Sequence, residues 1–158
     1  MVTALGIFVQ MNIYNNELIG VLSLQEVLFI TKKCTIVNLA IVLPIIFHKK
    51  SLNYLAHKKT KIISIQDLLL TKPELLSSLN KRYYNFLPIT INCLSLCIEN
   101  NIASLENGEF SFSKRLIDDM LLTQLGNRVI KIKAASENIA SIISDSPSNV
   151  YDLCGISL

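Results

Sequence analysis

Hydrophobic residues recur every three or four positions along most of the chain, which is the spacing of one face of an α-helix. The first such stretch follows Asn15 and Asn16, either of which can serve as N-cap, and runs to about Lys32. Similar stretches predict helices over residues 65–70, 73–86, 89–100, 128–143 and 147–154. Pro88 should separate the 73–86 helix from the 89–100 helix, because a proline inside a helix removes one hydrogen bond. The chain is therefore predicted to be mainly α.

One short region, residues 102–112, shows a β pattern instead. Two apolar stretches flank Asn107 and Gly108, a pair that supplies the positive φ angles of a type I′ turn, and Phe110 and Phe112 share one face of the second strand. A helix followed by a two-stranded hairpin is the layout of a winged helix-turn-helix. We therefore expect one compact multi-helix domain over residues 1–158 with a winged helix-turn-helix-like hairpin.

Residues 38–61 join an apolar run, residues 39–47, to concentrated positive charge. No Asp or Glu occurs between Glu26 and Asp67, so this acid-free window holds about half of the 15 Lys and Arg residues. The exposed cations are expected to be Lys49, Lys50, Lys58, Lys59 and Lys61. Asn38 can act as N-cap of the apolar element that follows it. Pro44 would kink a helix or interrupt a strand ladder, so the pattern leaves the secondary-structure type of residues 39–47 open.

The same apolar run is too short to cross a membrane. A spanning helix needs about 20 apolar residues, whereas the best window here ends at Phe47 after 14 and is bracketed by lysine pairs. The N-terminus lacks the basic region and cleavage site of a signal peptide. We therefore expect a cytoplasmic protein.

Composition points towards a subunit. Hydrophobic residues make up 51% of the 158, only 17% are charged, and the mean hydropathy is +0.44. An unusually apolar monomer, a subunit with a constitutive interface and a membrane protein all fit these values. The short apolar window favours the subunit.

No catalytic or cofactor motif emerges from the sequence. The four cysteines form no C-x-x-C pair, and His48 and His57 both lie among lysines that would repel a metal ion. The glycines form no phosphate-binding loop, and no carboxylates have metal-ligand spacing. We expect no metal, no cofactor and no enzymatic activity.

The lysines of the acid-free window have two possible interpretations. They form either a solvated face that keeps an apolar protein in solution, or a surface that contacts phosphates or an acidic partner. The expected recognition helix, residues 89–100, carries no Lys or Arg, and the hairpin turn is flanked by Glu106 and Glu109. Both features oppose major-groove binding, so any DNA contact would be non-specific and made by the five lysines. A free-standing winged-helix DNA-binding regulator and a peripheral membrane protein that uses residues 39–50 are the alternatives.

Several segments, taken in order, resemble the middle component of bacterial three-component ABC-ATPase systems. Relatives of this family include the small subunit of Lamassu-type anti-phage defence complexes. The segments are Tyr14 to Glu17, residues 39–50 with their Leu-Pro-x-x-x-His-Lys run, residues 73–76 continuing to Arg82, residues 87–90, the turn at Gly108, and residues 150–156.

The resemblance implies a non-catalytic subunit that bridges an SMC- or Rad50-like ABC ATPase and an effector such as a nuclease. Such a subunit would brace the ATPase heads and restrain the effector until foreign DNA is sensed. It also implies a set of candidate subunit-interface residues: Tyr14, Asn15, Asn16, Glu17, Pro44, His48 and Arg82.

Overall fold

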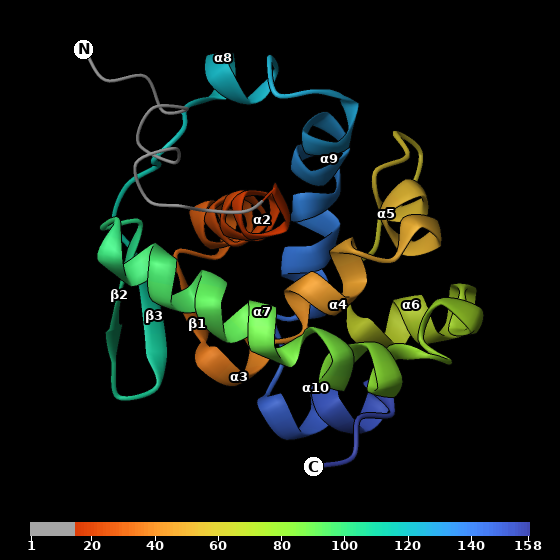
Figure 1. The fold of residues 1–158 in the computed structure, drawn as a ribbon. Coiled ribbons are helices and arrows are strands. Elements are labelled where there is room, and N and C mark those ends of the chain that lie inside the picture. Colours follow the sequence, from red (N-terminus) through yellow and green to blue (C-terminus); the bar gives the residue numbers. More distant parts are fainter. Residues whose placement is uncertain (1–14) are drawn as a thin grey trace.

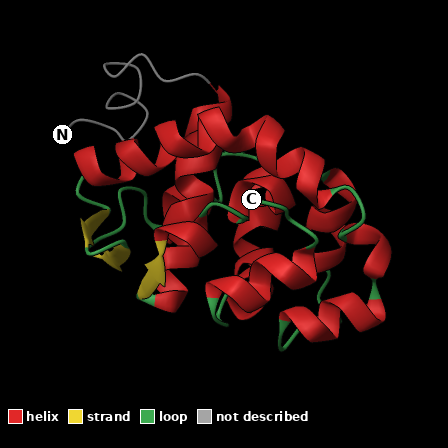
Figure 2. Cartoon of the chain, turned by 90° about the horizontal axis from the view of Figure 1, so that it is seen from below, coloured by secondary structure: helices red, strands yellow, loops and turns green. Residues whose placement is uncertain are grey.

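The computed structural model describes residues 15–158 as a mostly helical fold with a small antiparallel sheet at one side (Figures 1 and 2). The predicted mainly α class and the hairpin are confirmed. In chain order the elements are α2 (Asn15–Thr31), β1 (Lys33–Thr35), α3 (Ile36–Leu39), α4 (Val42–Ile46), α5 (Lys49–Leu55), α6 (Ile65–Thr71), the 3-10 helix η1 (Pro73–Leu75), α7 (Leu79–Glu99), β2 (Ala103–Glu106), β3 (Glu109–Phe112), α8 (Asp119–Leu122), α9 (Asn127–Ile142) and α10 (Pro147–Cys154).

Helix α2 is the centre of the fold. It packs against α7 and α9, and Figure 1, which looks along it, shows these two helices passing on different sides. Every residue from Gly20 to Val27 is buried, including Ser23, Gln25 and Glu26. A helix that is buried all round needs apolar residues on every face and paired polar groups, and both conditions hold here.

Gly20 allows α2 and α7 to approach each other closely. A Cβ at this position would lie 2.5 Å from the sulfur of Cys93 and 3.2 Å from a methyl carbon of Leu43. Only a glycine fits that contact without displacing a neighbour. The close approach brings Cys93 and Cys97 of α7 into the core, where both are fully buried.

The sheet has the order β1-β3-β2. Asn107 and Gly108 have φ angles of 52° and 75°, as the type I′ turn requires, and Phe110 of β3 is fully buried. Strand β1 was not predicted, because three residues carry too little alternation to be recognised in a sequence. The winged helix-turn-helix interpretation of the hairpin stays a prediction.

The sequence left the secondary structure of residues 39–47 open. In the structure these residues are helical or form turns between short helices. The hydroxyl of Thr35 caps α3 by accepting a hydrogen bond from the Asn38 amide, so the expected N-cap role of Asn38 is wrong. Pro44 is the third residue of α4, where its missing N–H leaves no hydrogen bond unmade. All five residues of α4 are buried.

The predicted helix boundary at Pro88 is wrong. Helix α7 runs through it as a single 21-residue helix. A proline inside a helix costs about 3 kcal/mol, but α7 buries side chains both before and after Pro88, among them Tyr83, Cys93 and Cys97. The predicted start at Pro73 is also wrong, since residues 73–75 form η1 and α7 begins at Leu79.

Among the described residues, no single helix has both the length and the hydropathy needed to cross a membrane. The stretch from Ile36 to Ile46 has the required length and hydropathy only when it is joined to α5, and the two parts are bent by 101° relative to each other.

Candidate cationic contact surface

The five lysines of the acid-free window lie on α5 and on the loop that follows it. Lys49 and Lys50 open α5, and Lys58, Lys59 and Lys61 lie in residues 56–63, here named the basic loop. All five side chains are exposed, and none forms an ion pair with another residue of the described part of the chain. Their charge therefore faces solvent without a neutralising carboxylate.

A buried asparagine of α9 holds the basic loop in place. The side-chain oxygen of Asn138 accepts a hydrogen bond from the Ile62 amide at 2.8 Å. Its nitrogen donates to the carbonyl of Leu55, the last residue of α5, at 2.8 Å and to the carbonyl of Thr60, within the loop, at 3.1 Å. One side chain thus satisfies three backbone groups that have no regular secondary structure to pair with.

Helix α9 adds two cations that the sequence analysis missed. A cleft of about 300 Å³ lies between α5 and the first turns of α9, and Lys49, Arg128 and Lys131 are among the residues that line it. None of the described residues that line this cleft is Asp or Glu. We use the name cationic surface for the five lysines together with Arg128 and Lys131.

The side chains of Arg128 and Lys131 both contact neighbouring side chains that position them. The Lys131 ammonium donates to the side-chain oxygen of Asn53 at 2.8 Å. The Arg128 guanidinium lies 5.1 Å from the centroid of the Phe47 ring, and that ring stacks on Phe86. The sequence does contain a signal for them, a basic run at the start of the 128–143 helix, but nothing in the sequence places that run beside α5.

His48 does not add to this charge at neutral pH. Its Nδ1 lies 2.7 Å from the hydroxyl of Ser51. Partial burial lowers the pKa of His48 below its usual value, and the nearby charges of Arg82 and Lys50 lower it further. The side chain is therefore neutral near pH 7.

Arg82 joins two segments inside the fold. One terminal nitrogen donates to the carbonyl of Pro44 at 2.6 Å, and the other donates to the carbonyl of Leu75 at 2.6 Å. The remaining side-chain nitrogen donates to the hydroxyl of Ser78 at 3.1 Å. The structure therefore brings Pro44, His48 and Arg82 together, although 38 residues separate the first from the last.

The remaining candidate interface residues lie at the start of α2, at a different place on the molecule. Asn16 is exposed and Glu17 is half-buried, with one carboxylate oxygen accepting a hydrogen bond from Asn92 at 3.4 Å. Asn15 is the first residue of the helix, and Tyr14 lies outside the described residues.

The cysteines are packed as small hydrophobic side chains. All four are buried, and burial raises the pKa of Cys34, Cys93 and Cys154 to about 12, so these thiols stay protonated. Within residues 15–158 no three His, Cys, Asp or Glu side chains lie close enough together to hold a metal ion.

Comparison with known proteins gives one match. A family model described as "ABC-three component (ABC-3C) system Middle Component 3" matches residues 23–158, which is most of the chain. The resemblance found in the sequence is thereby confirmed at the level of the family. Neither the curated proteins nor the solved structures gave a match.

Proposed function

Because the chain belongs to the middle component 3 family of ABC-three component systems, we propose that it is a non-catalytic adaptor that bridges an ABC ATPase and an effector. The family match over residues 23–158 is the observation that carries this proposal. By analogy with the Lamassu-type complexes that the sequence resembles, the ATPase is SMC- or Rad50-like, the effector is a nuclease, and the assembly defends the cell against phage.

Two features of the surface support an adaptor. Several large apolar side chains are strongly exposed, including Leu70 at 84%, Met120 at 73% and Ile63 at 71%. The cationic surface carries seven cations from α5, the basic loop and α9. Apolar side chains and unpaired positive charge both suit contact with other macromolecules.

The candidate interface residues have two roles in this proposal. Asn16 and Glu17, at the start of α2, are placed to contact a partner. Arg82 and Pro44 act indirectly, because their mutual hydrogen bond positions α4 and therefore the beginning of α5, where Lys49 and Lys50 lie.

Co-purification tests the adaptor function directly. The chain carries an affinity tag and is co-expressed with the ABC ATPase and the third component encoded beside it. We expect both to elute with the tagged chain through a size-exclusion column in 150 mM salt. Elution of the tagged chain alone as a monodisperse species would refute the proposal.

The cationic surface has a separate test. Replacing Lys49, Lys50, Lys58, Lys59 and Lys61 with glutamate should leave the far-UV circular dichroism unchanged and weaken binding to duplex DNA or to the partner subunits. The matched control is Lys81→Glu with Lys114→Glu, two exposed lysines outside the surface. Unchanged binding by the five-lysine variant would mean that these side chains only keep the protein in solution.

The dependence of DNA binding on salt separates the proposed contact from the alternative of a free-standing winged-helix regulator. A surface that contacts phosphates through lysines should lose affinity with a slope of roughly 0.9 log units per phosphate for each tenfold rise in salt. Preference for one DNA sequence that persists at moderate salt would instead favour the regulator.

A further inference from the structure

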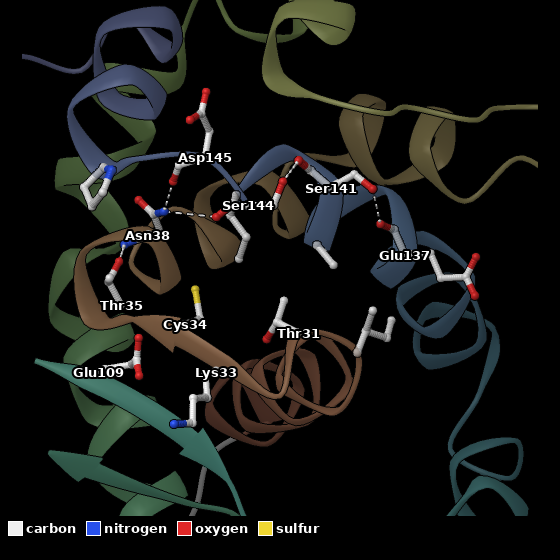
Figure 3. A pocket seen from close by; sticks show the side chains of 14 residues that line it. Thr31, Lys33, Cys34, Thr35, Asn38, Glu109, Glu137, Ser141, Ser144 and Asp145 are labelled. Carbon is white, nitrogen blue, oxygen red and sulfur yellow. Dashed lines mark hydrogen bonds between the residues drawn. The ribbon is translucent and has the colours of Figure 1, made fainter.

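A second cavity, of about 680 Å³, lies on another part of the molecule, beside the sheet (Figure 3). One wall is the end of α2 and strand β1, represented by Thr31, Lys33 and Thr35. The opposite wall is the end of α9 and the loop that leads to α10, represented by Ser141 and Ser144. We name this cavity the β1 groove.

Within residues 15–158, strand β1 is an edge strand, and the edge that has no partner there faces this groove. The sheet order β1-β3-β2 gives β1 a described neighbour on one side only. The Lys32 carbonyl accepts a hydrogen bond from the Phe112 amide of β3 at 2.7 Å, and the Ile36 amide donates to the carbonyl of Gly108, in the turn just before β3, at 2.9 Å. Because the direction of peptide groups alternates along a strand, the amides of Lys33 and Thr35 point away from β3. Figure 3 shows β1 between β3 and the cavity, so these amides face the open space.

The opposite wall is held at a distance from β1 by a buried side chain. The side-chain nitrogen of Asn38 donates to the carbonyls of Ile143 at 3.0 Å and Asp145 at 2.8 Å. These bonds fix the loop after α9 (Figure 3). Asn38 is only 3% exposed, and its side-chain oxygen accepts no hydrogen bond from the described residues. The groove is thus built from fixed walls, and a buried acceptor in its lining is left unsatisfied.

The groove carries a net negative charge. Its lining includes the carboxylates of Glu109, Glu137 and Asp145 but the ammonium of Lys33 alone. Hydrogen bonds from the Ser146 amide and from the side chains of Asn149 and Gln66 lower the pKa of Asp145, so this group remains charged. Apolar side chains, including Ile30 and Ile143, line the same space.

We propose that the β1 groove binds an extended segment of a partner subunit that carries lysine or arginine side chains and adds to β1 as a fourth strand. Main-chain hydrogen bonds to Lys33 and Thr35 supply the pairing, as in other cases of strand addition. The basic side chains face Glu109 and Glu137, and apolar ones pack against Ile30 and Ile143. This inference rests on the adaptor function proposed above, which supplies the partner.

Thr35 offers a matched pair of variants. Its φ angle of −64° already equals that of proline, and the preceding residue is extended, so Thr35→Pro fits the backbone while removing an outward amide. Thr35→Ala keeps the amide. Both variants lose the hydroxyl that caps α3, so a difference between them reports on the strand edge and not on the cap.

The test uses the full chain with the purified ABC ATPase and third component of its own system. Binding of the Thr35→Pro variant should be at least tenfold weaker than that of Thr35→Ala. Hydrogen exchange at the Lys33 and Thr35 amides should be fast in the isolated chain and slow in the complex. A second variant, Glu137→Lys, changes an exposed side chain of α9 and should also weaken binding if Thr35→Pro proves to be unfolded.

Each contrary outcome has a distinct meaning. Equal binding by both Thr35 variants, with the amides still exchanging fast in the complex, would overturn the groove proposal and leave the adaptor function standing. Failure of the unmodified chain to bind either subunit would overturn both. Protection of the same amides in an isolated dimer would identify a second copy as the occupant. If the Lys33 and Thr35 amides are protected in the isolated chain and lose this protection when residues 1–14 are deleted, that segment is the occupant instead. Either of these last results would also refute a partner segment.

Discussion

The basic loop should depend on Asn138. Replacing Asn138 with alanine removes its three hydrogen bonds to Ile62, Leu55 and Thr60. A net contribution of about 1 kcal/mol for each bond gives a loss of about 3 kcal/mol. Alanine is the better helix former and recovers about 0.5 kcal/mol of this within α9. We therefore expect the free energy of unfolding to fall by roughly 2–3 kcal/mol, which is roughly a 30- to 150-fold change in the equilibrium constant.

Urea denaturation followed by circular dichroism measures this loss, and hydrogen exchange locates it. The Ile62 amide should exchange much faster in the variant, because its acceptor is gone. Asn92→Ala is the control, since Asn92 is an exposed helical asparagine whose one side-chain bond is long, and it should change stability by less than about 0.5 kcal/mol. If Asn138→Ala is as stable as the parent and Ile62 stays protected, Asn138 does not organise the loop.

Three further predictions concern the core. Glu26→Ala should lower the unfolding free energy, measured in urea, by about 3 kcal/mol. The Arg115 guanidinium lies 3.0 Å from a Glu26 oxygen and loses this buried partner in the variant. A near-neutral effect would refute this reasoning. Gly20→Ala should lower the unfolding free energy by about 1–3 kcal/mol, because the added methyl group clashes with Cys93. The double variant with Cys93→Ala should be more stable than the sum of the two single effects predicts, and strict additivity would show that the contact is not tight. Burial raises the pKa of Cys34, Cys93 and Cys154 from 9.0 to about 12, so the thiols favour the folded state fully below pH 9 and progressively less as the pH rises from 9 towards 12. Urea midpoints should therefore fall above pH 9, and should fall less steeply when all three cysteines are alanine.

Local signals in the sequence were read correctly where short-range chemistry decides the conformation. The turn at Asn107 and Gly108 requires two positive φ angles that few other residue pairs adopt easily, and the hairpin forms there. The predicted helices at 65–70 and 147–154 also form: Ser64, just before α6, caps it by accepting a hydrogen bond from the Asp67 amide, and Gly155, just after α10, ends it in a left-handed conformation. These features depend on groups within four residues of one another.

The errors at Pro88 and Asn38 have the opposite cause. The local cost of Pro88 is real, but α7 continues because its buried side chains pack against α2 and α4, and no local pattern contains that information. Asn38 has the chemistry of an N-cap, yet its side chain bonds to carbonyls more than 100 residues away. In both cases long-range burial outweighed a local preference.

The sequence by itself determined the helical class, the hairpin, the family and the exposure of five lysines, because periodicity, turn chemistry and ordered motifs are properties of neighbouring residues. Only the tertiary structure decided which of these residues meet. It brings Arg128 and Lys131 beside Lys49, binds the basic loop to Asn138, and, within the described part of the chain, leaves one edge of β1 facing a cavity. Such contacts depend on how α2, α5 and α9 pack together, and packing brings together residues that are far apart in the chain.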